Sequence, residues 1–337
     1  MKQLGISVIV CCFNSARRIE LTLRHLLDQE LSSDLDWEII VIDNRSTDGT
    51  AKQASDFLSE QSGSIGWKVV QETEPGLSNA RNKGFEEARF NIVLMVDDDN
   101  SLASDYVQGI WNSFQDNAKV GMVGGTGIAA LESEPPAWFK QYDFCYAIGP
   151  QSEGDQTVEH LYGAGLALRM DVLEALRQAG FQSLLSDRVG NSLMSGGDTE
   201  LCFAFRLAGY ELLHRPDLTF KHHLPLARVN WKYLRRLFSG FGHTKAYMEI
   251  YTAAVSGKPV PTEGRLPFWL DRSIYLGKNL IPDLPLLLLG SIAPMEGNGK
   301  LLTALAKLGQ IKRIFALRSE YLLMFKKVYA LRDSLRS

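Results

Sequence analysis

The chain has 337 residues, of which 45% are hydrophobic and 22% are charged, as in an ordinary globular protein. This composition excludes fibrous and disordered classes, and the length allows one large domain or two modest ones. The net charge of −3 conceals an asymmetry, because residues 221–337 hold 19 Lys and Arg against 7 Asp and Glu. This basic third is predicted to face anionic lipid, nucleic acid or the acidic first part of the chain.

The cysteines and the longest apolar run bear on the cellular compartment of the protein and on whether it spans a membrane. Four cysteines are scattered along the chain, and their spacing matches neither a disulfide framework nor a zinc site. They predict buried thiols in a reducing, cytoplasmic setting. The longest apolar run, 280–294, is interrupted by prolines, an aspartate and a glycine, and is shorter than the roughly 20 residues of a membrane-spanning helix. We therefore expect no membrane span.

Strands and helices are predicted to alternate along the first 123 residues. Residues 5–13 form a nearly continuous apolar, β-branched run, which is typical of a strand covered on both faces. Further strands are predicted at 37–43, 67–72, 91–96 and 120–123, with helices at 15–29, 48–60, 77–88 and 103–114. This repetition predicts an α/β fold, with a mostly parallel, Rossmann-like sheet and helices on both faces.

Polar residues follow several of these strands, at the edge where open α/β sheets bind ligands. Asn14 follows the first strand, Asp43 ends the second, and three aspartates at 97–99 follow the fourth. Carboxylates that converge on one edge repel one another unless a cation or a positive ligand group lies between them. Mg²⁺ and Mn²⁺ prefer such oxygen ligands and also bind phosphate. The sequence therefore predicts a divalent metal beside a phosphate-bearing ligand.

Four segments together resemble the inverting family 2 glycosyltransferases of the GT-A fold, of the type that builds bacterial surface polysaccharides. They are V-I-V-C-C-F-N at 8–14, V-I-D-N-R-S-T-D-G-T at 41–50, G-L-S-N-A-R-N-K-G at 76–84 and V-D-D-D-N at 96–100. The resemblance covers about the first 220 residues. It implies transfer of a sugar from a nucleotide-diphosphate donor, with a UDP-sugar as the first expectation, to a saccharide or lipid-linked acceptor.

The resemblance also implies roles for single residues on the donor side. Asp43 is expected to contact the nucleobase, Asn14 belongs to the nucleotide-facing loop, and Arg81 lies near the nucleotide. In the D-x-D motif, Asp97 is expected to face the ribose and Asp99 the metal.

Alternation along a strand makes Asp97 and Asp99 point the same way. Asp98 is included among the donor-binding residues, although its side chain points elsewhere. A histidine after a later strand in related enzymes completes the metal or diphosphate site, so His222 or its neighbour His223 is a further metal ligand, with His222 preferred. Four basic residues follow, and one or two of them are candidates to neutralise the leaving diphosphate: Arg228, Lys232, Arg235 and Arg236.

A catalytic base must come from another segment, because an inverting displacement needs it on the acceptor side of the sugar. The segment G-G-D-T-E-L at 196–201 resembles the family's G-E-D-x-E-L, which makes Asp198 the expected base. Gly197 replaces the usual Glu, so the supporting role of the neighbouring acid is in doubt. A plain helix N-cap is the alternative for Asp198.

The residues that bind the acceptor are harder to predict from the sequence than those that bind the donor. Trp138 is predicted to contact the acceptor, because aromatic rings beside glycines commonly hold sugar rings, and Glu200 is included as a second acceptor contact. Trp138 and Tyr162 are as well explained as core residues.

The chain is predicted to divide into a catalytic domain at 1–225 and a mostly helical, basic region at 226–337. Apolar residues recur at helical spacing from Leu301 to Tyr329, with lysines and arginines among them. Such helices either lie on an anionic membrane surface, at the inner face of the cell membrane, or pack on the catalytic domain. No nucleic-acid partner is expected, because basic charge alone is weak support for one.

Three other functions are weighed against this interpretation. A nucleotidyltransferase should carry a Gly-rich, basic loop after the first strand, and Cys12–Ser15 is no such loop. A dinucleotide-dependent dehydrogenase should show G-x-G-x-x-G there, which is missing. A non-catalytic scaffold that binds sugar nucleotides or glycans stays open because of Gly197.

Overall fold

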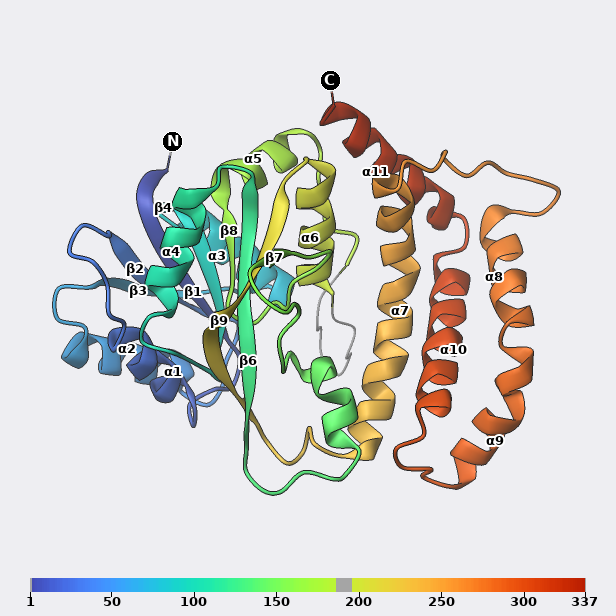
Figure 1. Cartoon of the computed structure of the whole chain (residues 1–337), viewed down its shortest axis with the longest axis horizontal. Coiled ribbons are helices and arrows are strands. Elements are labelled where there is room, and N and C mark those ends of the chain that lie inside the picture. Colours follow the sequence, from blue (N-terminus) through green and yellow to red (C-terminus); the bar gives the residue numbers. More distant parts are fainter. Residues whose placement is uncertain (1, 186–195, 337) are drawn as a thin grey trace.

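A computed structural model describes residues 2–185 and 196–336. In this part of the chain, nine strands form one sheet in the order β3-β2-β1-β4-β8-β6-β9-β5, with β7 paired to β9 (Figure 1). The strands are β1 (Gln3–Cys12), β2 (Trp37–Asp43), β3 (Gly66–Gln71), β4 (Phe90–Asp97), β5 (Asn100–Leu102), β6 (Val120–Leu131), β7 (Gln156–Thr157), β8 (Leu166–Arg169) and β9 (Glu211–Leu224).

The first four strands form the parallel half of the sheet that the sequence predicts. β1 lies between β2 and β4 and runs parallel to both, and β3 extends the sheet beyond β2. The connecting helices are α1 (Ile19–Leu27), α2 (Thr50–Gln61), α3 (Leu77–Glu87) and α4 (Tyr106–Asp116). The α/β prediction is therefore confirmed, and these elements match it to within a few residues at each end.

The second half of the sheet is mixed, so the prediction of a mostly parallel sheet holds only for the first half. β8 is antiparallel to both β4 and β6, while β6 runs parallel to β9. The short strand β5 returns antiparallel to β9 directly after the aspartates at 97–99. This return brings the end of β9, with its two histidines, beside the acidic end of β4.

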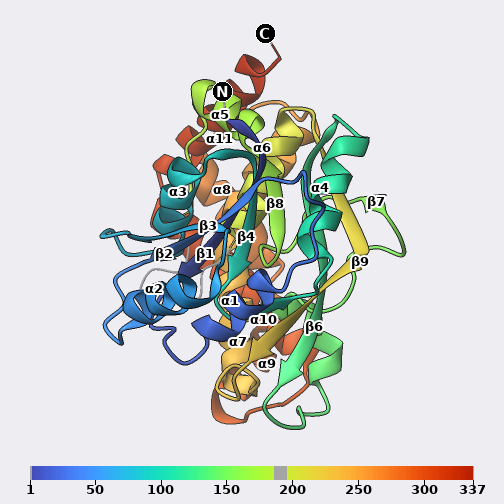
Figure 2. The same ribbon diagram turned by 90° about the vertical axis from the view of Figure 1, so that its left-hand side faces the viewer.

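Helices cover both faces of the sheet (Figure 2). One apolar core joins the sheet to α1, α2 and α4, and includes the buried side chains of Val8, Leu23 and Leu58. The other core joins the opposite face to α3, α5 (Met170–Gln178) and α6 (Gly197–Leu207), and includes Ile9 and Phe205. The alternation of Val8 and Ile9 between the two cores is what a doubly covered strand requires.

The C-terminal region is helical, as predicted, and lies to one side of the sheet (Figure 1). Its longest helices pack closely, because a Cβ at Gly242 of α7 would lie 2.0 Å from the backbone oxygen of Ala306 in α10. No helix in the described ranges has the length and apolar character needed to cross a membrane. The helices of this region are α7 (Trp231–Val255), α8 (Phe268–Lys278), η2 (Ile281–Asp283), α9 (Leu284–Ile292), α10 (Gly299–Leu317) and α11 (Glu320–Ser334). One further short helix, η1 (Phe139–Tyr146), lies between β6 and β7.

Candidate functional site

Two predicted donor residues lie side by side at the carboxyl edge of the parallel strands. In the sheet register, Asp43 pairs with Cys12 and Asp97 pairs with Cys11, so the two carboxylates flank the end of β1. Asp43 is 3% exposed, and its Oδ1 accepts a hydrogen bond from the Ser46 backbone at 3.3 Å. Both cysteines are free thiols, as predicted, and burial raises their pKa values.

The loops around this edge are fixed to one another through two asparagines. Asn14 adopts a left-handed conformation with φ of 52°, and its Oδ1 accepts a hydrogen bond from the Thr47 backbone at 2.9 Å. Asn44 joins the next loop, because its Oδ1 accepts from Gly76 at 2.8 Å and its Nδ2 donates to the carbonyl of Glu74 at 2.6 Å. Sequence analysis predicted Asn14 and missed Asn44, although Asn44 stands inside a quoted motif.

The three consecutive aspartates separate in the way that strand alternation predicts. Asp99 turns toward His222, and Asp97 lines the same cavity as that histidine. Asp98 faces away, where its oxygens accept hydrogen bonds from Ser15 and, at 2.9 to 3.0 Å, from Arg18. The predicted donor contact of Asp98 is therefore corrected. A carboxylate that is 8% exposed and shares a bidentate ion pair holds the β4–β5 turn against the start of α1.

Asp99, His222 and Arg228 form a charged cluster, in which His222 and Arg228 line the cavity and Asp99 is buried beside them. His222 Nε2 lies 3.5 Å from one oxygen of Asp99, and Arg228 donates to the other oxygen at 3.0 Å. Burial opposes ionisation of Asp99, but the hydrogen bond and charge of His222 and the charge of Arg228 outweigh it, so the pKa of Asp99 is held below its ordinary value.

The two adjacent histidines face opposite ways. His222 Nδ1 lies 2.8 Å from the Tyr146 carbonyl, which can only accept, so this nitrogen carries a proton. Its Nε2 then faces Asp99 with either a second proton or a lone pair. Burial lowers the pKa of His222, yet the hydrogen bond with Asp99 and its charge raise it above the ordinary value. His223 instead meets the Ser101 hydroxyl at 2.9 Å, outside the cavity.

A cavity of about 390 Å³ joins the donor edge to the start of α6. Asp198 and Arg81 meet on one of its walls, because a Cβ at Gly163 would lie 2.6 Å from Asp198 Oδ2 and 3.1 Å from an Arg81 nitrogen. Asp198 stands in the first turn of α6, where its Oδ1 accepts from the Thr199 backbone at 2.8 Å. Gly196 occupies the N-cap position, so the alternative of a plain N-cap is wrong for Asp198. The structure thus brings the predicted base and a predicted donor residue together.

Aromatic rings from three separate segments also line this cavity. Sequence analysis mentioned only Tyr162 among them, because the others belong to η1 and α7 and meet it only in the folded chain. Phe144 is 52% exposed, which leaves a ring face open to a ligand. The aromatic lining consists of Phe144, Tyr146, Tyr162, Tyr233 and Phe241.

Trp138, which we predicted as an acceptor contact, lies elsewhere. It is 8% exposed and packs edge-on against Trp231, with ring centroids 5.5 Å apart, in an apolar cluster between η1 and α7. Its Nε1 finds no hydrogen-bond partner among the described residues. The prediction is corrected because the ring supports the aromatic wall from behind and does not reach the cavity.

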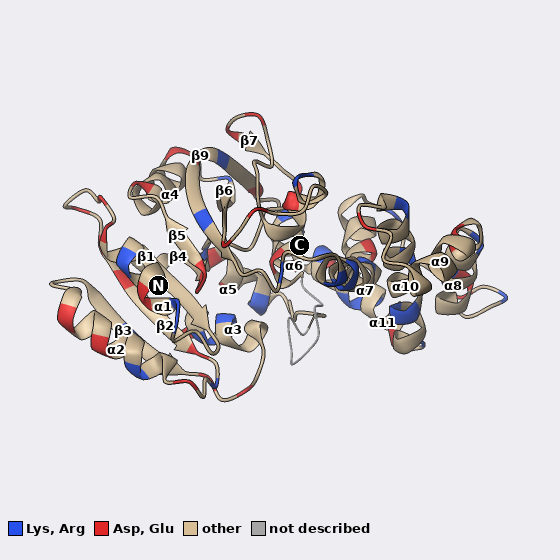
Figure 3. Cartoon of the chain, turned by 90° about the horizontal axis from the view of Figure 1, so that it is seen from below, with Lys and Arg blue, Asp and Glu red and all other residues tan. Residues whose placement is uncertain are grey.

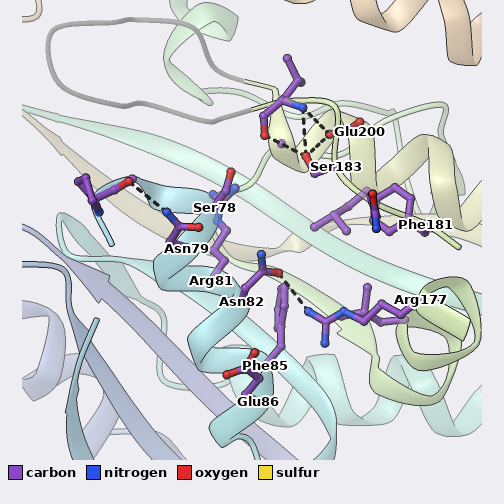
Figure 4. Close-up of a pocket in the computed structure, with 17 residues that line it drawn as sticks. Ser78, Asn79, Arg81, Asn82, Phe85, Glu86, Arg177, Phe181, Ser183 and Glu200 are labelled. Atoms are coloured by element: carbon purple, nitrogen blue, oxygen red, sulfur yellow. Dashed lines mark hydrogen bonds between the residues drawn. The ribbon is translucent and has the colours of Figure 1, made fainter. Parts of the chain in front are cut away.

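Glu200 is also placed away from the predicted acceptor contact, beside a second cavity of about 630 Å³ between α3, α5 and α6 (Figure 4). Its carboxylate is 1% exposed and accepts hydrogen bonds from Ser183, from the Leu184 backbone at 2.7 Å and from the Tyr251 hydroxyl at 2.7 Å. Burial raises its pKa, against the effect of these hydrogen bonds. Glu200 therefore ties α6 to α7, and the acceptor role is corrected.

The donor set fits a metal ion that arrives with phosphate, and does not form a complete metal cage. The described residues hold no group of three or more His, Cys, Asp or Glu side chains that could bind a metal. Asp99 and His222 bring a carboxylate oxygen and an imidazole nitrogen within 3.5 Å of each other, and these two atoms could serve as ligands. Mg²⁺ and similar ions are commonly bound through one or two carboxylates, with waters and substrate phosphates completing the shell.

Comparisons with known proteins agree with this geometry. The sequence profile described as "Glycosyl transferase family 2" matches residues 7–177, just over half of the chain. The chain is 23% identical to the glucosyl-dolichyl phosphate glucuronosyltransferase of Haloferax volcanii, over 82% of this chain and 87% of the relative. It is 34% identical to the cholesterol galactosyltransferase of Borreliella burgdorferi, but over only 32% of this chain and 28% of that protein.

The fold is shared with a solved mannosyltransferase from Pyrobaculum calidifontis, in complex with GDP-Man and Mn²⁺. The TM-score is 0.56 at 20% identity, over 98% of this chain and 86% of that one. The profile match supports a glycosyltransferase over the nucleotidyltransferase and dehydrogenase alternatives. The chain belongs to glycosyltransferase family 2, has the GT-A fold and is a glycosyltransferase.

Proposed function

We propose that this enzyme transfers a sugar, with inversion and metal assistance, from a nucleotide-diphosphate donor to a saccharide or lipid-linked acceptor. The observation that carries the proposal is a single cavity whose walls include Asp97, Arg81, His222, Arg228 and Asp198. The Haloferax relative is named for a glucosyl-dolichyl phosphate acceptor, which supports a lipid-linked acceptor here as well.

The donor side is proposed to bind the nucleotide through the strand-end residues. Asp43 would contact the base, Asp97 the ribose, and Asn14 and Arg81 the remainder of the nucleotide. Asp99 and His222 would hold a Mn²⁺ or Mg²⁺ ion together with the diphosphate. When bound, the ion stabilises negative charge on the leaving diphosphate.

Arg228 is available for a second task on the leaving group. Its guanidinium pairs with Asp99 at 3.0 Å and is 30% exposed on the cavity side. We propose that Arg228 transfers its hydrogen bonds to a diphosphate oxygen when the donor enters, because guanidinium groups bind phosphate well in this geometry.

Asp198 is proposed to act as the general base. The acceptor oxygen attacks the anomeric carbon, the bond from that carbon to the diphosphate oxygen breaks, and the hydroxyl proton passes to Asp198 Oδ2. Oδ1 already accepts from Thr199, which leaves Oδ2 oriented for this transfer. The aromatic rings of η1 and α7 would hold the acceptor.

We propose residues 1–225 as the catalytic domain and 226–337 as a helical region that completes the acceptor wall through α7. A lipid-linked acceptor would place the enzyme in the cytoplasm, at the inner face of the cell membrane. A UDP-sugar is the donor to test first, although the mannosyltransferase that shares the fold binds GDP-Man.

Calorimetric titration of the purified protein with UDP, GDP and dTDP, each with and without Mn²⁺, tests the proposal. We expect one nucleotide to bind, and to bind at least about tenfold more tightly with Mn²⁺ present. If only GDP binds, the proposed donor is a GDP-sugar and not a UDP-sugar. Absence of binding to all three by the folded protein would contradict the proposed donor class.

Gly163→Ala should lower kcat by about 10- to 100-fold with little change in thermal stability. The added methyl group would lie 2.6 Å from Asp198 Oδ2 and 3.0 Å from its Cβ, so the carboxylate must move. Steady-state kinetics and thermal unfolding check this result. Gly180→Ala is not a suitable control because Gly180 has a positive φ, whereas Gly264→Ala adds its methyl group in open space and should leave kcat unchanged. Equal kinetics in both variants would mean that Asp198 is not held against Gly163 during transfer.

A further inference from the structure

The helix α9 carries an unusually apolar exposed face. Gly290 is the only buried residue of this helix, and it docks closely, because a Cβ there would lie 2.7 Å from the Leu301 side chain of α10. The opposite face points to solvent and is made of large aliphatic side chains. On α9 the exposed fractions are 46% for Leu284, 70% for Leu288, 52% for Leu289 and 83% for Ile292, and Ile281 of the preceding η2 is 60% exposed.

Basic side chains lie before and after this apolar segment in the chain and on the start of α7, whose Arg235 donates to the Gly290 carbonyl of α9. Exposed lysines stand at both ends of the segment, Lys278 before it and Lys300 after it. The acidic Asp283 within it is already paired with Lys307, at 2.7 Å. Lys232 and Arg236 add exposed positive charge on the first turns of α7, where Figure 3 shows Lys and Arg gathered. An aliphatic face with a basic rim is complementary to an anionic lipid surface.

The segment that follows α9 is joined to the walls of the acceptor cavity. The indole of Trp231, at the start of α7, donates to the carbonyl of Pro294. The hydroxyl of Tyr142, in η1, lies 3.4 Å from the carbonyl of Gly297. Because η1 and α7 supply the aromatic lining of the cavity, a surface that α9 contacts would lie on the same side of the molecule as the acceptor wall (Figure 1).

We propose that α9 is a monotopic membrane-docking helix, which inserts its aliphatic face into the headgroup region of an anionic bilayer. A helix of nine residues is too short to span the bilayer, and insertion at the interface needs only one apolar face. This assigns membrane contact to α9, whereas the sequence analysis considered it for the basic helices after Leu301, with packing on the catalytic domain as the alternative. In α10 and α11 the apolar side chains at 301, 314, 321, 325 and 329 are buried within the protein.

Vesicle co-sedimentation tests this docking surface without using activity. We expect the full chain to bind phosphatidylcholine vesicles containing 30% phosphatidylglycerol, and to bind pure phosphatidylcholine more weakly. Leu288→Asp combined with Ile292→Asp should weaken binding at least about tenfold. Leu288→Ser with Ile292→Ser serves as a second pair if the aspartates disturb folding. Leu323→Asp is the matched control, because Leu323 is 50% exposed on α11.

Several results would overturn the proposal. One is unchanged binding by the α9 variants, and another is equal loss in the Leu323 variant. Complete loss of wild-type binding in 0.5 M salt would mean that the protein is held on the vesicle by surface charge alone and that α9 does not insert. Light scattering tests whether a second copy of the chain covers α9 instead of lipid. If the wild type forms a dimer that the α9 variants do not form, and does not bind vesicles, then α9 is a dimer interface and the proposal is wrong. Nucleotide titration of the same variants keeps this test separate from the donor site.

Discussion

Asp198→Asn should reduce kcat by at least about a thousandfold, while the affinity for the donor nucleotide changes less than about threefold. Asparagine has nearly the same shape and still accepts from the Thr199 backbone, so the start of α6 is preserved. It cannot take the proton of the acceptor hydroxyl, and that is the role proposed for Oδ2. Transfer assays with saturating donor and calorimetric titration of the nucleotide measure the two quantities separately.

Asp171→Asn is the matched control for the structural contribution of an aspartate in the first turn of a helix. Asp171 stands in the first turn of α5, and its Oδ1 accepts from the next backbone nitrogen at 2.9 Å, in the same way as Asp198 in α6. It lies outside the cavity, so its variant should keep full activity. Similar losses of activity in both variants, or loss of nucleotide binding in Asp198→Asn, would mean that Asp198 has a structural role at the start of α6 and is not the general base.

The parallel half of the fold is predictable because each element carries its own local signal. The run at 5–13 is apolar and β-branched, and the helices that follow show one apolar stripe. A strand covered on both faces needs no alternation, so its length alone indicates it. Four strands and four helices were therefore predicted with small errors at their ends.

The mixed half was predicted poorly because glycine and short strands hide it. β6 was expected to end at Val123, but it continues to Leu131 through Gly124, Gly125 and Gly127. These glycines disfavour a strand locally, yet a Cβ at Gly125 would lie 2.2 Å from the Leu218 carbonyl of β9, and one at Gly127 would lie 2.0 Å from the Ala147 carbonyl. Close backbone contacts of this kind are tertiary, and no periodicity reports them.

The candidate site, like the fold, has one part that the sequence predicts and one part that forms only on folding. Asn14, Asp43, Arg81 and Asp97 lie in contiguous motifs, so the sequence alone predicts them as donor-site residues. The aromatic wall comes from η1 and α7, which lie about a hundred residues apart along the chain and meet only after folding. Partners also distinguish acidic residues that look alike in sequence. Asp98 accepts from Arg18 and Glu200 accepts from Tyr251, whereas Asp99 pairs with His222 and Arg228, which line the cavity.

Asp99→Asn should remove the metal dependence of nucleotide binding, so that affinity with Mn²⁺ falls at least about tenfold, to the value measured without the ion. The variant keeps the shape of the side chain but loses the charge that a cation requires. A second readout follows from His222, whose pKa is raised by its hydrogen bond with Asp99 and by the negative charge of that carboxylate. Without that charge, His222 should lose its proton at a lower pH than in the wild type, which a proton NMR titration detects.

Asp98→Asn is the neighbouring control and should show the opposite pattern. Asp98 is paired with Arg18 and Ser15 and does not face the cavity, so its variant should keep metal-dependent binding. It should instead unfold more easily, by about 1 to 2 kcal/mol, because the partly exposed Arg18 loses an ion pair and a charged hydrogen bond. If Asp98→Asn abolished the effect of Mn²⁺ and Asp99→Asn did not, the two carboxylates would have exchanged roles, and the ion would bind on the α1 side of the turn.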